Sequence, residues 1–207
     1  MRSYVRASDE PRFADLVAVR AGAVAALASE YPGTPRPDEA ELRAHDAITR
    51  RVHDAMPSLP ARFGALYEDP DALRAALVPR EKPLEHALAA LGTRVEVGVT
   101  LRWRAARPHM GPADASGRAF LEERAARERE RSEAGQIVER LVAELACERA
   151  LIRERICPHE GVAATVAVLT TRDGETNVRR RVESFGRNAS EVTTDLYGPF
   201  PPYSFVS

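Results

Sequence analysis

Apolar and polar residues alternate most regularly between residues 95 and 102. The apolar positions are Val95, Val97, Val99 and Leu101. A period of two is typical of a strand with one buried face, so the sequence predicts a half-buried strand here. Shorter apolar, valine-containing runs at 13–19, 162–169 and 192–197 predict three further strands.

Periods of three and four residues predict several helices. The clearest begins after Asp38, a good N-cap residue, and ends before Pro57. Its apolar face carries Leu42, His45, Ile48, Val52 and Met56. Shorter helices are predicted after Asp69, near Pro83 and at 177–185.

Two segments fit more than one structure. Residues 21–29 fit either a short helix, because they are rich in alanine, or a buried strand. Residues 59–66 are predicted to be extended, and they contain Arg62, Phe63 and Gly64. This tripeptide is interpreted either as a strand end with a bulge or as a surface that faces a partner.

A long helix is predicted from residue 118 to residue 155, where there is no proline and charge is dense. Heptad-like spacing relates Val138, Leu141, Leu145 and Ile152. Gly135 is the point at which such a helix could break. Two interpretations stay open, a helix packed on its own lobe and an exposed arm or coiled coil that binds a partner.

The order of these elements predicts an α+β fold in two lobes. We expect an N-terminal α+β lobe at 1–106, a linker rich in proline and glycine at 107–117, and a C-terminal lobe at 118–207. The C-terminal lobe would contain the long helix and a small sheet.

Composition narrows the class of protein and its location. The net charge of −1 provides no general attraction for nucleic acid or acidic membranes. The two cysteines are too few for a disulfide scaffold, and no apolar run approaches the ~20 residues of a membrane span. The first fifteen residues also lack the apolar core of a signal peptide. A cytoplasmic location is therefore predicted.

The residues supply no convincing catalytic, cofactor or metal site. The nearest approach to a metal set is His45-Asp46 with His53-Asp54, but eight residues place the two histidines ~80° apart on a helix. A second weak set, with no fourth ligand nearby, comprises Cys147, Cys157 and His159. We therefore expect no catalytic residue, no cofactor and no metal.

The C-terminal segment 198–207, here called the tail, reads Gly-Pro-Phe-Pro-Pro-Tyr-Ser-Phe-Val-Ser. Its prolines exclude a helix and stiffen the chain. Its aromatic residues are Phe200, Tyr203 and Phe205. A stiff aromatic terminus is expected to dock, either inward to close the interface between the lobes or outward as an anchor for a partner.

The tail resembles the C-terminal signature of the GvpF/GvpL gas vesicle protein family, Gly-Pro-Trp-Pro-Pro-Tyr-Ser-Phe, with Phe200 in place of tryptophan. Ala65 likewise stands where threonine is common. Further similar segments occur in order along the chain, at 25–29, 45–46, 59–64, 95–99 and 117–121. The similarity at 25–29 favours a strand for that ambiguous segment.

The resemblance implies a ferredoxin-like first lobe, either complete or reduced, because the family's opening strand is degenerate here at Ser3-Tyr4-Val5. It also implies a non-enzymatic accessory role in gas vesicle assembly, with the shell protein and other accessory proteins as partners. Partner contacts are expected at Arg62, Phe63, Phe200, Tyr203 and Phe205. The alternatives are a relative recruited to another protein assembly and a small metal-dependent hydrolase that uses His45, Asp46 and His53.

Overall fold

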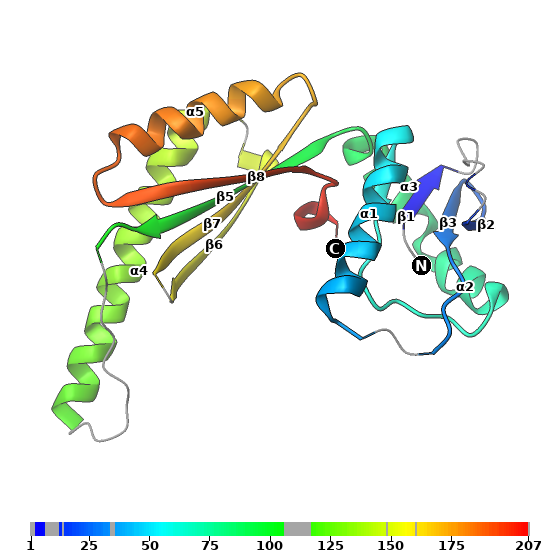
Figure 1. Ribbon diagram of the computed structural model, residues 1–207, viewed down its shortest axis with the longest axis horizontal. Coiled ribbons are helices and arrows are strands. Elements are labelled where there is room, and N and C mark those ends of the chain that lie inside the picture. Colours follow the sequence, from blue (N-terminus) through cyan, green and yellow to red (C-terminus); the bar gives the residue numbers. More distant parts are fainter. Residues whose placement is uncertain are drawn as a thin grey trace. The chain divides into compact units, whose positions relative to one another are not determined.

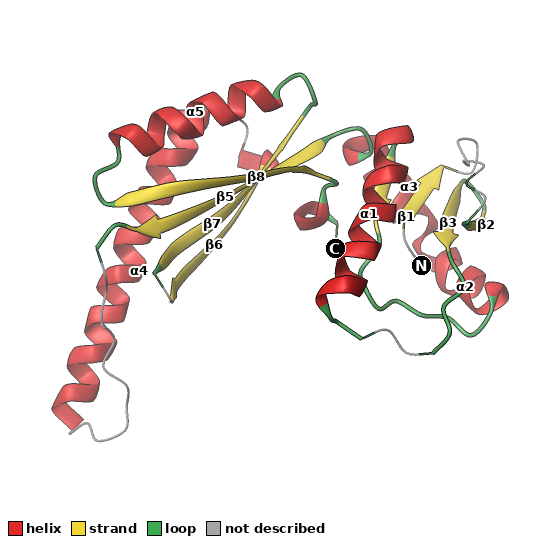
Figure 2. Cartoon of the chain, in the orientation of Figure 1, coloured by secondary structure: helices red, strands yellow, loops and turns green. Residues whose placement is uncertain are grey.

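A computed structural model describes residues 3–6, 13, 15–33, 36–105, 117–147, 149–159 and 161–206, without the side chains of residues 6, 119, 150 and 157–159. The chain forms two compact units. The first comprises Met1–Val95 with Phe200–Ser207, and the second comprises Glu96–Pro199. Each unit contains a four-stranded antiparallel sheet, so the α+β prediction is confirmed (Figure 2).

In the first unit the elements are β1 Ser3–Arg6, β2 Val17–Ala21, β3 Val24–Ala28, α1 Glu39–Ala55, β4 Ser58–Pro60, α2 Pro70–Leu77, a 3-10 turn at Val78–Arg80 and α3 Glu81–Leu91. The strands lie in the order β2-β3-β1-β4, and Figure 1 labels the first three of them. The degenerate opening segment thus forms β1, an interior strand between β3 and β4.

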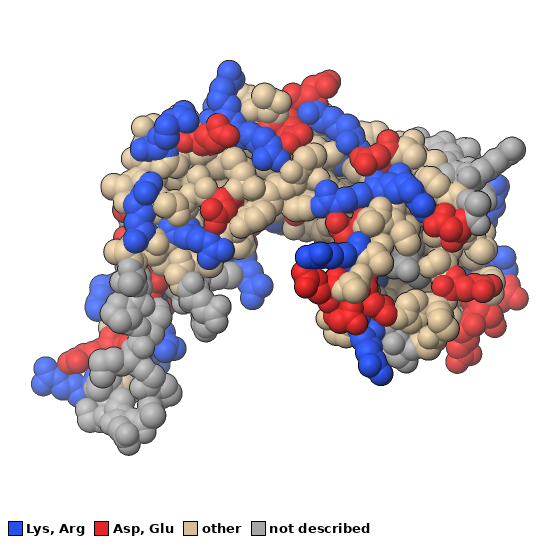
Figure 3. Space-filling model, in the orientation of Figure 1, with Lys and Arg blue, Asp and Glu red and all other residues tan. Residues whose placement is uncertain are grey.

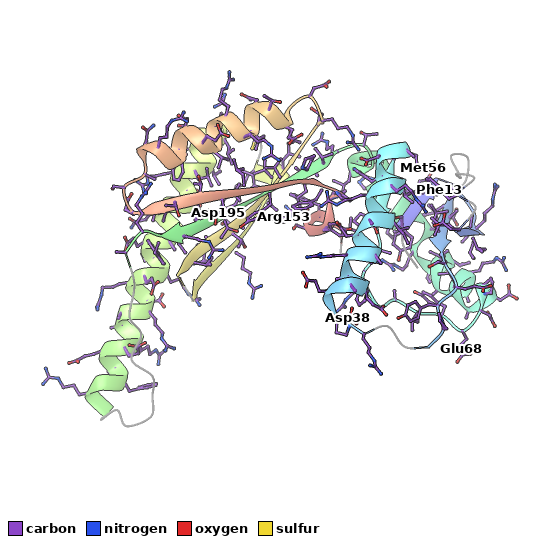
Figure 4. All side chains as sticks on the ribbon, viewed as in Figure 1. Phe13, Asp38, Met56, Glu68, Arg153 and Asp195 are labelled. Atoms are coloured by element: carbon purple, nitrogen blue, oxygen red, sulfur yellow. The ribbon has the colours of Figure 1, made fainter. Side chains whose placement is uncertain are left out.

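Helices cover both faces of the first sheet. On one face Val5 and Leu27 pack against Val52 of α1, and Figure 4 shows Phe13 and Met56 beside each other at this layer. On the other face Tyr4 and Val24 share a core with residues of α2 and α3. Because β3 is buried on both faces, it lacks alternation, which explains why residues 21–29 could not be distinguished from a helix.

The helix predicted after Asp38 is confirmed in its bounds, although Leu42 of the predicted apolar face is exposed. The Asp38 carboxylate accepts a hydrogen bond from the Glu41 backbone N–H (2.9 Å), and α1 ends at Ala55, before Pro57. The prediction of a strand at 13–19 was wrong at its start. Phe13 and Leu16 pack as loop residues in the core below α1, and β2 begins at Val17.

In the second unit the elements are β5 Val95–Trp103, α4 Gly117–Leu145, a 3-10 turn at Arg149–Leu151, β6 Ile152–His159, β7 Val162–Thr170, α5 Glu175–Asn188 and β8 Val192–Phe200. The terminal strands β5 and β8 each share one end residue with the first unit. The sheet order is β6-β7-β5-β8, which repeats the topology of the first sheet. The complete β-α-β-β-α-β succession of a ferredoxin-like fold is therefore in this unit, where only a small sheet was expected.

Both helices of the second unit pack on one core. Val97, Val99 and Leu101 of β5 face residues of α4 and α5. The first residues of α4 extend past the sheet (Figure 1), and the buried positions of the helix begin at Glu130. The alternation that predicted β5 therefore reflects a strand with one face in this core.

The predicted helix at 118–155 was wrong from residue 146 onward. The helix passes Gly135 without a break and ends at Leu145, followed by Ala146 with a positive φ of 48°. Ile152, which fitted the heptad spacing, instead starts β6 and reaches the same core from a strand. A residue two turns past a helix end can satisfy a heptad pattern and still alternate in a strand, so spacing alone could not locate this boundary.

The boundary between the units also differs from the one expected at residue 106. It falls after Val95, the first residue of β5, because β5 pairs with β7 and β8 of the second sheet. The linker expected at 107–117 lies outside the described residues except for Gly117, which begins α4. The tail was assigned to the second lobe, but its residues from Phe200 onward belong to the first unit.

We predict that Leu141→Ala, in the core of the second unit, lowers the free energy of unfolding by about 2–5 kcal/mol, because it leaves a cavity at a fully buried position. The matched control is Leu121→Ala on the same helix, where the side chain is 63% exposed and the change should be under about 0.5 kcal/mol. Urea unfolding followed by fluorescence of Trp103, which lies in the same core, measures both. Equal effects of the two variants would contradict this packing.

Candidate partner-binding surface

The tail docks on the first unit through α1. The Tyr203 hydroxyl donates a hydrogen bond to Asp46 Oδ1 (3.0 Å), and Arg50 Nε donates to Asp46 Oδ2 (2.6 Å). The Arg50 guanidinium also lies over the ring of Phe200, 4.5 Å from its centroid. Because Asp46 and Arg50 are four residues apart on a helix, their side chains lie on one face and can hold two tail residues together.

Tight local turns and burial stiffen the docked tail. The Tyr203 backbone N–H donates to the Pro201 carbonyl (2.7 Å), the Phe205 N–H donates to the Pro202 carbonyl (3.2 Å), and both prolines are buried. Val206 packs against the core that α2 and α3 share with the sheet. The tail therefore docks on α1 of its own chain; the prediction that it closes the interface between the lobes stays a prediction.

Burial raises the pKa of Tyr203 above its ordinary value, and the nearby charge of Asp46 raises this pKa further. The side chains of Thr49 and Arg50 act in the opposite direction. The phenol is therefore held in its neutral form, in which it can donate the hydrogen bond to the carboxylate.

Arg62, Phe63 and Gly64 form a turn directly after β4, not a bulge. The Ala65 N–H donates to the Arg62 carbonyl (3.3 Å), and Gly64 has a φ of 78°. Positive φ at the third position of a turn favours glycine, which explains the residue choice. The turn places the Phe63 ring edge-on to His45, with 5.5 Å between centroids, and leaves Arg62 exposed.

These elements surround a hollow of about 750 Å³ in the first unit, here called the Arg62 hollow. Its lining includes Leu42, His45, Arg62, Phe63, Tyr67, Arg80, Tyr203 and Val206. Three of the five predicted partner-binding residues, Arg62, Phe63 and Tyr203, thus come together. Phe200 and Phe205 are half-buried, and neither lines the hollow.

Tyr67 and Arg80 line the hollow although sequence reasoning did not select them. Arg80 Nη1 donates to the Tyr4 hydroxyl (3.1 Å), and burial raises the Tyr4 pKa while Arg80 lowers it. Tyr67 follows the Arg62 turn closely in sequence, which was an available signal. Arg80 lies in the 3-10 turn after α2, and no local pattern indicates that it reaches β1.

The candidate metal ligands do not assemble into a site. His45 Nε2 donates to the Ala61 carbonyl (3.1 Å), and His53 Nε2 donates to the Arg94 carbonyl (2.9 Å). Both histidines are buried and connect α1 to neighbouring segments, while Asp46 binds the tail. Within the described ranges no three His, Cys, Asp or Glu residues come close enough to hold a metal ion.

The second weak set of metal ligands is only partly described. Cys147 is half-buried and packs against the core of the second unit. The side chains of Cys157 and His159 lie outside the described residues.

The sequence from residue 12 to residue 207 matches the gas vesicle synthesis protein GvpL/GvpF family. The chain belongs to this family. It is 30% identical to gas vesicle protein F of Streptomyces sp. (strain CB03234), over 89% of this chain and 85% of that protein.

Two crystal structures of GvpF share the fold of this GvpL/GvpF chain. The protein from Anabaena sp. PCC7120 aligns with a TM-score of 0.70 at 19% identity, over 92% of this chain and 87% of that chain. The protein from Microcystis aeruginosa aligns with a TM-score of 0.70 at 16% identity, over 92% and 88%. The resemblance found in the sequence motifs is therefore confirmed at the level of family and fold.

We predict that Gly64→Ala lowers the free energy of unfolding by about 1 kcal/mol, because a Cβ is disfavoured at φ 78°. Gly117→Ala is the matched control. Both glycines have open space around an added Cβ, but only Gly64 has a positive φ. Differential scanning calorimetry compares the two, and a neutral Gly64→Ala would contradict the turn geometry.

We predict that Tyr203→Phe lowers stability by about 1 kcal/mol near pH 7, because the hydrogen bond to Asp46 is lost. It should also reduce the loss of stability in alkali. Below pH 10.0, the ordinary pKa of tyrosine, the folded and unfolded chains both keep the proton. Above that pH the unfolded chain releases it first, so the wild-type chain loses stability as pH rises toward the raised folded pKa.

Urea unfolding between pH 8 and pH 11 measures both effects, and Tyr67→Phe is the control because Tyr67 is an exposed tyrosine of the same unit. Tyr4, whose pKa is also raised, contributes a similar alkaline slope in every variant. An unchanged slope in Tyr203→Phe would contradict a buried, docked Tyr203.

Proposed function

We propose that this chain is a non-enzymatic accessory protein of gas vesicle assembly that binds the shell subunit or other accessory proteins. The observation that carries this proposal is the family match over residues 12–207. Membership of the GvpL/GvpF family implies a role in gas vesicle formation. The partners, the cytoplasmic location and the association with the vesicle are part of the proposal.

The Arg62 hollow supports a binding role of this kind. Arg62 is exposed and has no ion-pair partner among the described residues, while Phe63 and Tyr203 provide aromatic surface beside it. Arginine and aromatic side chains in a hollow are typical of positions that contribute most to protein–protein affinity. In this proposal Arg62, Phe63 and Tyr203 contact the partner, and Phe200 and Phe205 hold the tail that forms one wall.

Two alternatives have less support. A metal-dependent hydrolase would need His45, Asp46 and His53 free to bind an ion, but backbone carbonyls and the tail occupy them. A relative recruited to another assembly would keep the same fold, and the identity of the captured partner distinguishes it. Among the described residues no helix is both long enough and apolar enough to cross a membrane.

We predict that the tagged full-length chain captures the shell subunit or an accessory protein encoded in the same genome, and that Arg62→Glu weakens capture about tenfold. Reversing a charge at a binding surface removes one attraction and adds a repulsion. Lys82→Glu is the matched control, because Lys82 is an exposed cation of the same unit that lies outside the hollow.

Biolayer interferometry with the purified proteins measures the affinities. If no gas vesicle protein binds the folded wild-type chain, the proposed function is wrong. If capture occurs and both charge reversals have the same effect, a partner exists but the Arg62 hollow is not its site.

A further inference from the structure

The first unit has a second hollow, formed where β2 and the end of β3 meet the segment that leads into α2 (Figure 4 labels Glu68 on that segment). It measures about 710 Å³, and we call it the Glu68 groove. We propose that the Glu68 groove binds an apolar segment of a gas vesicle protein that carries at least one arginine or lysine. This inference rests on the proposed function and adds the chemistry of the partner.

The floor and walls of the groove present apolar side chains to solvent. Val17 is 53% exposed, Leu66 is 45% exposed and Tyr67 is 38% exposed. All three line the groove together with Leu73. Val17 also lies on β2, one of the two edge strands of the sheet, where charged side chains usually protect against association. Exposed apolar residues gathered in one hollow are typical of a binding site, whereas single ones are ordinary.

The negative charge around the groove favours apolar partner segments that also carry a basic residue. Among the described residues, three carboxylates line it, those of Glu30, Glu68 and Asp69, and no arginine, lysine or histidine does. The Asp69 carboxylate caps α2 by accepting from the Ala72 N–H (2.7 Å). Glu30 and Glu68 have no ion-pair partner among the described residues. Figure 3 shows acidic side chains gathered at the lower right of this unit, where Figure 4 labels Glu68.

The Arg62 hollow has the opposite character, although Tyr67 lines both. Its described lining contains Arg62 and Arg80, and the one carboxylate among these residues, Asp46, already accepts hydrogen bonds from Arg50 and Tyr203. A partner segment with a basic residue is therefore attracted to the Glu68 groove and repelled by the Arg62 hollow. Complementary charge of this kind fixes which segment binds in which hollow.

The test uses the full chain and fluorescent 15-residue peptides that tile each gas vesicle protein encoded in the same genome. We expect the peptides that bind to be apolar with an arginine or lysine. We expect Glu30→Arg with Glu68→Arg to weaken their binding about tenfold or more, and Leu66→Ser to weaken it as well. The matched controls are Glu85→Arg, an exposed glutamate on α3, and Val78→Ser, a residue 59% exposed outside both hollows.

The outcomes separate this inference from the proposed function. If intact vesicle proteins bind the chain but the groove variants bind as well as the controls, the inference is wrong and the proposed function stands. If the peptides that bind lack basic residues, or if a second copy of this chain occupies the groove, the inference is also wrong. If no vesicle protein binds in any form, both proposals fail.

Discussion

The Asp46 carboxylate is the contact on which the arrangement of the first unit depends. One oxygen accepts from Tyr203 and the other from Arg50, whose guanidinium lies over Phe200. Through these contacts the last residues of the chain become part of the unit that its first residues form. One wall of the Arg62 hollow is therefore formed by the tail.

The docking of the tail explains how an aromatic segment rich in proline is accommodated on the folded first unit. Pro201 and Pro202 are buried and restrict the backbone of the tail, so less conformational entropy is lost when Tyr203 docks. The aromatic residues of the tail, which suggested an anchor for a partner, make contacts within the chain, with Asp46 and Arg50. If the tail binds a partner, it does so while docked, with Phe200, Tyr203 and Phe205 already half-buried.

The sequence predicted the elements that show a clear period and missed those set by contacts distant in sequence. Strand β5 and helix α1 were predicted because each has one face in a core, whereas β3 is buried on both faces and reads equally as a helix. The end of α4 was misplaced because Ile152 fits a heptad as well as a strand. The repeated strand order of the two sheets has no signature in the amino-acid pattern, because pairing order is a tertiary property.

The candidate site was also predictable only where local sequence carries a signal. The tail and the Arg62 turn have distinctive local composition, so both could be selected from the sequence. The bond between Tyr203 and Asp46 joins residues 157 positions apart, and no spacing rule reaches that far. Tyr67, Arg80 and the carboxylates of the Glu68 groove became candidates only when the fold brought them to hollows.

The central claim is that the tail completes the first unit by docking on α1. Hydrogen–deuterium exchange of the full chain, compared with a chain that ends at Phe200, tests this most directly. The account predicts faster exchange in α1 and in residues 58–67, with the strands of the second unit unchanged. Unchanged exchange in α1, or an equal increase in both units, would contradict it.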